Sequence, residues 1–293
     1  MKTILVPTDF SQNATNALHY AAALAYQVRG KLIITHIINL PISPPGSGVV
    51  MPPDVPREKA CQEELNRLEK ELRLENGFRF EVETIWQYGY FMANLNTLVK
   101  EQAVDLVVMG TKGATNFLDK LVGTNTAQFI KMALCPVLAI PAKAEFTGIK
   151  NIAYASDFES DETIFLQQLF GITEVFNPQT FIINILTERQ LNIFADNQVV
   201  RHIMRNFPDK KCSIAQIQEG DVVEGLHAFV KENQADILAV SIHERSLLES
   251  IFHQSISKKL VYHTRVPVLA LPEKPCRPPV VKTNTLKNQN QVK

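Results

Sequence analysis

The stretch Lys2–Ile38 reads KTILVPTDFSQNATNALHYAAALAYQVRGKLIITHII. It begins with a short apolar, β-branched run that stops at Pro7, which predicts a buried strand followed by a turn. Apolar residues then recur at helical spacing as far as Arg29-Gly30, where the glycine predicts the end of a helix. An isoleucine-rich run, Lys31–Ile38, predicts a second strand. A strand, a helix and a strand of this length form a right-handed crossover, so we expect a parallel sheet.

A second strand-to-helix junction carries an unusual concentration of glycines. Of the 12 glycines in the chain, three lie at Gly110, Gly113 and Gly123, and Thr124 follows the last, with the spacing G-x2-G-x9-G-T. Glycine lets backbone N–H groups approach an anion closely, and a helix start offers unpaired N–H groups. Each glycine alone is also typical of an ordinary loop between a strand and a helix. The spacing therefore leaves two interpretations open, a phosphate site and a structural loop.

Further strands and helices are predicted between these two stretches and after them. Residues Leu40–Pro56 are rich in proline and glycine, so we expect an irregular insertion, either a lid or a plain surface loop. The other elements expected are a helix at 54–75 with a solvated charged face, a strand at 78–86, a helix at 92–104, a strand at 105–109, a helix at 124–134 and a strand at 136–140. The first half should therefore hold five strands and four helices.

The pattern then repeats. Lys2–Phe10 is matched by Lys150–Phe158 at an offset of 148, and Cys135–Pro141 is matched by Val266–Pro272 at an offset of 131. The second copy is therefore shorter, by about the size of the proline-rich insertion. Such self-similarity predicts two tandem domains, at residues 1–143 and 148–273, followed by a basic tail at 274–293 that we expect to be disordered.

The two copies differ in the glycine loop. At the offset of 131, Ser241, Glu244 and Gln254 stand where the first copy has its three glycines. An acidic residue would repel a phosphate. We therefore expect the second copy not to bind a ligand in the way that the first does.

Composition restricts the class of protein. The 293 residues suit about two domains, and 45% of them are hydrophobic. The net charge is zero, which favours neither nucleic acid nor an anionic membrane as a partner. The sequence has no apolar stretch long enough to span a bilayer. Its four cysteines form no C-x-x-C pair, so we expect reduced thiols and a cytoplasmic protein.

Several of these features together resemble one family. They are Pro7-Thr8-Asp9 after the first strand, His36-Ile37 at the end of the second, Gly89, and the complete glycine signature. The chain resembles a tandem universal stress protein of the UspA superfamily. The resemblance implies an α/β fold with two tandem open five-stranded parallel sheets of order 3-2-1-4-5, flanked by helices, in the adenine nucleotide alpha hydrolase-like class.

The same resemblance implies ATP as the ligand of the first copy, and it leaves open an accompanying Mg²⁺. The adenine end would lie against the main chain at the ends of the first two strands. The ribose and the phosphates would lie along the glycine loop, the phosphates at the start of the following helix. The residues implied are Pro7, Thr8, Asp9 and Ile37 for adenosine, Met109 and Gly110 for ribose and the first phosphate, and Gly113, Gly123, Thr124 and Asn125 for the phosphates.

The resemblance also implies partners. The two copies would pair through their last strands, and a homodimer of the whole chain is left open. The leading hypothesis is a non-catalytic, nucleotide-responsive stress regulator or adaptor. The alternatives are a slow ATPase or phosphotransferase that uses Asp9 and Lys112, and a nucleotide-free interaction module. A metal site built from His243, Glu244, His253 and His263 is disfavoured, because their spacing follows no compact ligand pattern.

Overall fold

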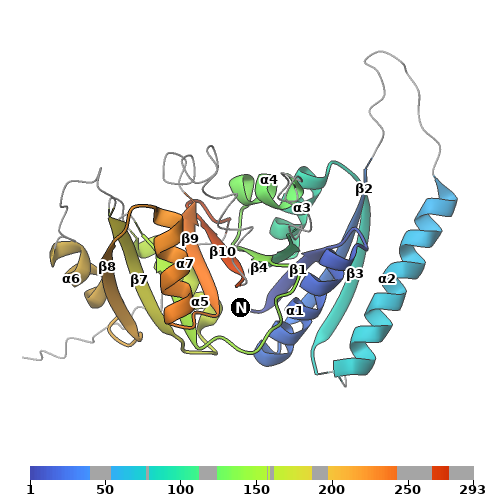
Figure 1. Ribbon diagram of the computed structural model, residues 1–293. Helices are drawn as coiled ribbons and strands as arrows, with labels where there is room; N and C mark the ends of the chain where they lie inside the picture. The colour runs from blue at the N-terminus through green and yellow to red at the C-terminus, as the bar shows by residue number, and fades with distance from the viewer. Residues whose placement is uncertain are drawn as a thin grey trace, which may run out of the picture.

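The computed structural model describes residues 1–39, 54–76, 79–111, 124–156, 158, 162–186, 197–242 and 266–276. These residues form one ten-stranded sheet with helices against it (Figure 1). The strand order is β3-β2-β1-β4-β5-β10-β9-β6-β7-β8. The predicted α/β class is therefore confirmed, and so is the order 3-2-1-4-5, which occurs once in each half of the sheet.

The first half contains the five strands and four helices expected from the sequence. All its neighbouring strands are parallel. Its elements are β1 (Thr3–Pro7), α1 (Gln12–Val28), β2 (Lys31–Asn39), α2 (Val55–Asn76), β3 (Glu81–Gly89), α3 (Phe91–Glu101), β4 (Leu106–Gly110), α4 (Thr124–Met132) and β5 (Val137–Ile140).

The second half repeats this order at the other end of the sheet. Its neighbouring strands are also parallel. Its elements are β6 (Asn151–Ala155), α5 (Thr163–Thr173), β7 (Gln179–Leu186), α6 (Asn197–Asn206), β8 (Cys212–Gln218), α7 (Val222–Glu232), β9 (Ile237–Ile242) and β10 (Val268–Pro272).

The two halves meet at an antiparallel pair of strands. β10 lies beside β5, with Leu269 opposite Leu138, and this is the antiparallel pair in a sheet whose other described pairs are parallel. Every residue of both strands is buried. We refer to this pair below as the seam.

Both faces of the sheet are covered by apolar side chains. In β1, Ile4 and Val6 belong to the apolar cluster on one face, which also includes residues of α1, α2 and α5, whereas Leu5 belongs to the cluster on the other face, which includes residues of α3, α4 and α7. Alternate residues of a strand point to opposite faces, so burial on both faces requires the continuous apolar run seen in the sequence. Each such side chain contributes about 1.5–3 kcal/mol of burial free energy.

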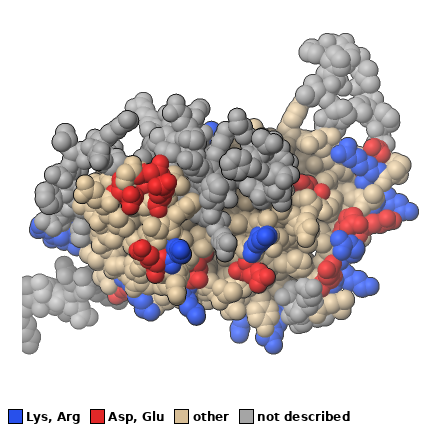
Figure 2. All heavy atoms as spheres, viewed as in Figure 1, with Lys and Arg blue, Asp and Glu red and all other residues tan. Residues whose placement is uncertain are grey.

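The charged face of α2 is exposed. Arg67 forms ion pairs with Glu64 and Glu71, one turn away on either side, and positive and negative side chains alternate over this helix (Figure 2). Pairs of this exposure contribute little to stability. Their positions agree with the solvated face expected from the sequence.

Local details differ from the sequence expectations, among them the end of α3, which comes at Glu101 and not at 104. The left-handed residue that ends α1 is Arg29, with φ of 50°, and not Gly30. Gly30 is needed for another reason, because a Cβ there would lie 2.8 Å from the carbonyl oxygen of Lys2, the residue before β1. The strand predicted at 78–86 begins three residues later, at Glu81. The insertion predicted at 40–56 lies almost wholly outside the described residues, and the tail after 276 does so completely.

Among the described residues, no helix is both long enough and apolar enough to span a membrane.

Candidate functional site

The topology of the first half predicts a crevice at the carboxyl ends of β1 and β4. The helix that follows β1 covers one face of the sheet, and the helix that follows β4 covers the other. The two connections therefore leave neighbouring strands in opposite directions. In open α/β sheets, ligands bind at such a switch point. Residues from the carboxyl ends of β1, β2 and β4 and from the start of α4 meet here.

The turn between β1 and α1 is held from both sides. The Thr8 amide donates to the Thr35 carbonyl at 2.8 Å, and Nδ1 of His36 donates to the Thr8 carbonyl at the same distance. The hydroxyl oxygen of Thr8 accepts from the Phe10 amide at 3.0 Å, and Phe10 has a left-handed φ of 62°. A residue other than glycine adopts that conformation only when its surroundings impose it. The turn is consequently rigid.

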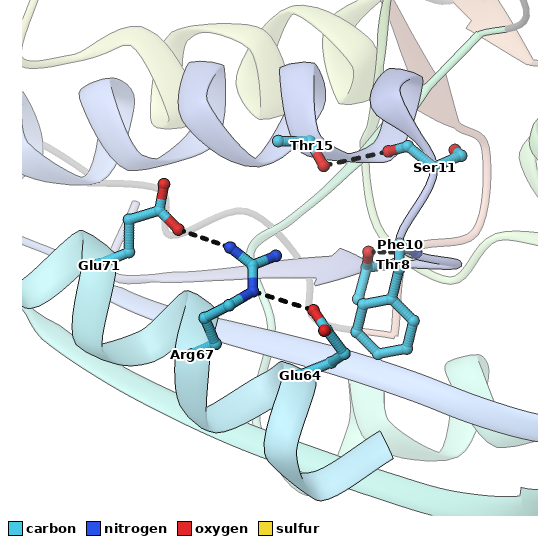
Figure 3. Close-up of polar contacts among 7 residues, drawn as sticks. All are labelled: Thr8, Phe10, Ser11, Thr15, Glu64, Arg67 and Glu71. Atoms are coloured by element: carbon cyan, nitrogen blue, oxygen red, sulfur yellow. Dashed lines mark hydrogen bonds and ion pairs between the residues drawn. The ribbon is translucent and has the colours of Figure 1, made fainter. Parts of the chain in front are cut away.

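Side chains on either side of this turn reinforce it (Figure 3). The ring of Phe10 stacks on that of His36, with ring centres 4.7 Å apart. Ser11 is the N-cap of α1, where its hydroxyl oxygen accepts from the Ala14 amide. The exposed Asp9 accepts from the Ser11 amide at 3.0 Å through one carboxylate oxygen. One of its two oxygens is thus committed to the turn.

Gly110, at the end of β4, is fixed by packing. A Cβ at this position would meet the backbone of the first turn of α1, with the carbonyl carbon of Asn13 at only 2.8 Å. The helix α1 therefore approaches β4 as closely as backbone atoms allow. This contact gives Gly110 a structural reason that is independent of any ligand.

The first turn of α4 is tied to the end of β4. The hydroxyl of Thr126 donates to the Gly110 carbonyl at 2.9 Å. The next residue of the strand segment, Thr111, donates its amide and its hydroxyl to the carbonyl of Ile140. The amino-terminal end of α4 is thereby held beside the end of the strand. A helix start at this place presents unpaired N–H groups to the crevice.

The structure brings together most of the residues implied for adenosine. Pro7 and Thr8 are buried at the end of β1, Asp9 is exposed, and Ile37 lies on the adjacent strand two residues beyond Thr35, the partner of Pro7. Met109 and Gly110 end β4. Asn125 is exposed in the first turn of α4, which begins at Thr124. Gly113, Gly123 and Lys112 lie outside the described residues, so the phosphate part of the predicted site stays a prediction.

Sequence reasoning missed the role of three residues. His36 was noted as part of a motif, but its hydrogen bond to the turn was not predicted. Neither Asn13 nor Thr126 was singled out, although both contact Gly110. A polar residue at the end of a buried strand was the signal that could have identified His36. The contacts of the other two depend on how α1 and α4 dock, which no local pattern encodes.

The second half contains the same turn with different supporting residues. The Ser156 amide donates to the Ile183 carbonyl at 2.8 Å, and Phe158 again has a left-handed φ, 58°. The donor to the Ser156 carbonyl is the Asn184 side-chain amide, at 3.0 Å, in place of a histidine. The turn is therefore preserved in both copies, whatever each copy binds.

A buried carboxylate distinguishes the second turn from the first. Glu162 is 2% exposed and accepts hydrogen bonds from the hydroxyls of Tyr154 and Ser156. At the offset of 148, Tyr154 and Glu162 replace Val6 and Ala14 of the first copy. The second turn is thus supported by a buried carboxylate where the first copy has apolar side chains.

Possible metal ligands were considered as well. Among the residues that the structure describes, no group of three histidine, cysteine, aspartate or glutamate side chains is arranged to hold a metal ion. The histidines weighed for this role in the sequence, at positions 243, 253 and 263, lie outside those residues.

Comparisons with known proteins agree with this architecture. The model of the universal stress protein family matches residues 1–141 and 189–272. A universal stress protein of Methanocaldococcus jannaschii is 26% identical over 155 residues, which cover 48% of this chain and 96% of that protein. One from Bacillus subtilis is 29% identical over 145 residues, which cover 47% of this chain and 97% of that protein. Each relative thus corresponds in length to one of the two halves.

Solved structures match the fold along almost the whole chain. A universal stress protein from Archaeoglobus fulgidus has a TM-score of 0.71 at 15% identity, covering 92% of this chain and 98% of its own. A universal stress protein solved in complex with cAMP is 22% identical over 47% of this chain, with a TM-score of 0.36, too low to transfer its ligand. The segment that the family model leaves unmatched, 142–188, contains Tyr154, Ser156 and Glu162.

Proposed function

Because the chain belongs to the universal stress protein family, we propose that it is a non-catalytic regulator or adaptor that responds to adenine nucleotide, with ATP bound by the first half alone. The arrangement of residues at the carboxyl ends of β1 and β4 in that half is the observation that carries this proposal. It combines a rigid turn, a strand end without side-chain bulk and a helix start held beside that strand end. These are the features that a backbone-recognised nucleotide requires.

The fit of ATP follows from the chemistry of the groups present. Main-chain groups of Thr8, Asp9 and Ile37 would hold the adenine, and Met109 and Gly110 would border the ribose. The start of α4, with Thr124 and Asn125, would receive the phosphates, together with Gly113 and Gly123. A Mg²⁺ ion would take its ligands mainly from phosphate oxygens and water, as this hard cation usually does at nucleotide sites.

In this proposal the second half serves as the structural partner or as an interaction surface. The domains are residues 1–143 and 148–273. The loss of the glycine loop argues against a nucleotide there, since Ser241 stands in the place of Gly110 and Glu244 in the place of Gly113. The seam would hold the two domains together as one unit. A homodimer of the whole chain and a cytoplasmic location complete the proposal, to be tested by light scattering and cell fractionation.

Hydrolysis of ATP is the second candidate function. Asp9 is the exposed carboxylate of the β1–α1 turn, and it already accepts a hydrogen bond from the Ser11 amide. A carboxylate used in this way is less suited to activating water than a free one. Turnover well above background that is lost in Asp9→Ala, with ATP binding retained, would favour the ATPase.

The site is tested by paired substitutions in the two halves. Gly113→Val places a side chain in the proposed phosphate loop, and Glu244→Val changes the corresponding position of the second half. Isothermal titration with Mg-ATP should give about one site per chain for the wild type and for Glu244→Val, and none for Gly113→Val. Full ATP binding by Gly113→Val would overturn the site, and no binding by the wild type would overturn the function.

A further inference from the structure

Two cysteines from opposite halves of the chain meet at the seam. Cys135 lies just before β5, and Cys276 follows β10 by four residues. Since the two strands are antiparallel, the start of one lies beside the end of the other. This end of the seam lies at the amino ends of β4 and β5, away from the crevice of the first half. Any chemistry here is therefore separate from the nucleotide site.

A hydrogen bond sets the distance between the two residues. The Cys276 amide donates to the carbonyl of Leu134, the neighbour of Cys135, at 2.7 Å. The path between the two cysteine Cα atoms consists of this hydrogen bond, the N–Cα bond of Cys276, and the distance across one peptide from the Leu134 oxygen to the Cys135 Cα. With standard bond lengths, the two Cα atoms are therefore at most about 7 Å apart. Disulfide-bonded cysteines usually have Cα atoms about 4.4–6.8 Å apart. The backbone geometry therefore suits a disulfide.

The two thiols differ in exposure and remain within reach of each other. Cys276 is exposed, whereas Cys135 is 3% exposed. Burial raises the pKa of the Cys135 thiol, and the nearby Cys276 raises it further. Cys135 is thus protected from direct oxidation, while Cys276 is accessible to small oxidants in solution.

The other two cysteines supply internal controls. Cys61 is buried on α2, and Cys212 lies on β8. These elements belong to opposite ends of the sheet, since α2 packs against β3 and β2. The sequence contains no pattern that pairs Cys135 with Cys276, because the counterpart of Cys135 in the second copy is Val266. Only the antiparallel seam brings them together.

We propose that Cys135 and Cys276 are a redox-active pair that forms a reversible disulfide when the protein meets hydrogen peroxide. The thiolate of Cys276 attacks one peroxide oxygen, the O–O bond breaks, and a sulfenic acid and water result once the leaving hydroxide takes a proton. The sulfur of Cys135 then attacks the sulfenic sulfur, the S–O bond breaks, and the departing hydroxide takes the Cys135 proton. Two thiols and one peroxide thus become one disulfide and two waters.

The crosslink would fasten the seam covalently. It closes a loop that contains the entire second half, so it restricts the unfolded chain strongly and stabilises the folded one. A dithiol reductant reverses it. The proposal does not depend on nucleotide binding, because the pair and the crevice lie at opposite ends of β4 and β5.

The test uses the full-length protein. Reduced protein is treated with hydrogen peroxide, its remaining thiols are alkylated with N-ethylmaleimide in denaturant, and the digest is mapped by mass spectrometry without reductant. We expect a linked peptide pair that contains Cys135 and Cys276 and disappears on treatment with dithiothreitol, with Cys61 and Cys212 still alkylated. The melting temperature of the oxidised wild type should exceed that of the reduced protein by several degrees.

Two variants make the result decisive. Cys276→Ser changes an exposed side chain and should abolish both the linked peptide and the thermal shift, whereas Cys212→Ser should retain both. The proposal is overturned if Cys135 is still fully alkylated in peroxide-treated wild type. This holds both when Cys276 has been oxidised to a sulfinic acid and when Cys276 links two chains. ATP binding should be the same before and after oxidation, so failure of this proposal is distinguishable from failure of the nucleotide site.

Discussion

Replacing Gly110 by alanine tests the packing of α1 against β4. The added Cβ would meet the Asn13 carbonyl, with its carbon at 2.8 Å, and the Ala14 nitrogen at 3.3 Å. These are backbone atoms, which no rotamer change can move. Either the first turn of α1 must shift or the strand must. Forcing one extra methyl group into such a contact costs about 1–3 kcal/mol.

Displacement of the first turn of α1 adds a second cost. Ser11 caps this helix through its hydroxyl, and loss of such a cap costs about 1 kcal/mol. The total for Gly110→Ala is therefore about 2–4 kcal/mol. With an m-value of about 2–3 kcal/mol per molar urea, the unfolding midpoint should fall by roughly 1 M. The turn that carries Thr8 and Asp9 is attached to the same helix, so ATP affinity should fall as well.

A matched control separates this contact from a general effect of adding a methyl group. Gly171 lies on α5, is exposed, and would have no atom within 4 Å of a new Cβ. Gly171→Ala should stabilise the protein by up to about 1 kcal/mol, because alanine favours the helix. Urea unfolding followed by circular dichroism measures both variants. A Gly110→Ala midpoint equal to that of the wild type would refute the packing argument.

Local patterns were sufficient to predict the elements of the first half and their repetition in the second. The apolar runs of β1 and β2 and the helical spacing of α1 between them indicate a parallel sheet, whereas the order of the strands was implied only by the family resemblance. They were not sufficient to explain individual glycines. Gly30 was interpreted as the end of a helix, and Gly110 as part of a loop or of a phosphate site. Both are required because the backbone of another segment approaches them closely. Such contacts depend on how the segments pack in three dimensions, which the spacing of residues along the chain does not reveal.

Only part of the candidate site could be predicted, because only part of it follows from the order of the strands. The residues at the ends of β1, β2 and β4 share an edge because parallel strands all end there, so their proximity follows from topology. The buried Glu162 and the cysteine pair do not follow from it. Glu162 occupies the position of the apolar Ala14 of the first copy, and its partner Tyr154 is buried in a strand. The cysteines are neighbours only through the antiparallel seam.

Two further substitutions test the supports of the two turns. His36→Ala removes the donor to the Thr8 carbonyl and the stack with Phe10, so it should cost about 1–2 kcal/mol and weaken ATP binding, whereas Asn39→Ala, at the exposed end of the same strand, should do neither. Equal ATP affinities in calorimetry would contradict this. Tyr154→Phe removes one of the two hydroxyls that donate to the buried Glu162 carboxylate, and because that oxygen has no access to water in exchange, the loss should be about 1–3 kcal/mol. Tyr90→Phe, on a side chain that is 68% exposed, should change stability by less than about 0.5 kcal/mol. If urea unfolding gives the two tyrosine variants the same midpoint, the Tyr154 hydroxyl does not stabilise the Glu162 carboxylate. The hydrogen bond between them is then not what distinguishes the second turn from the first.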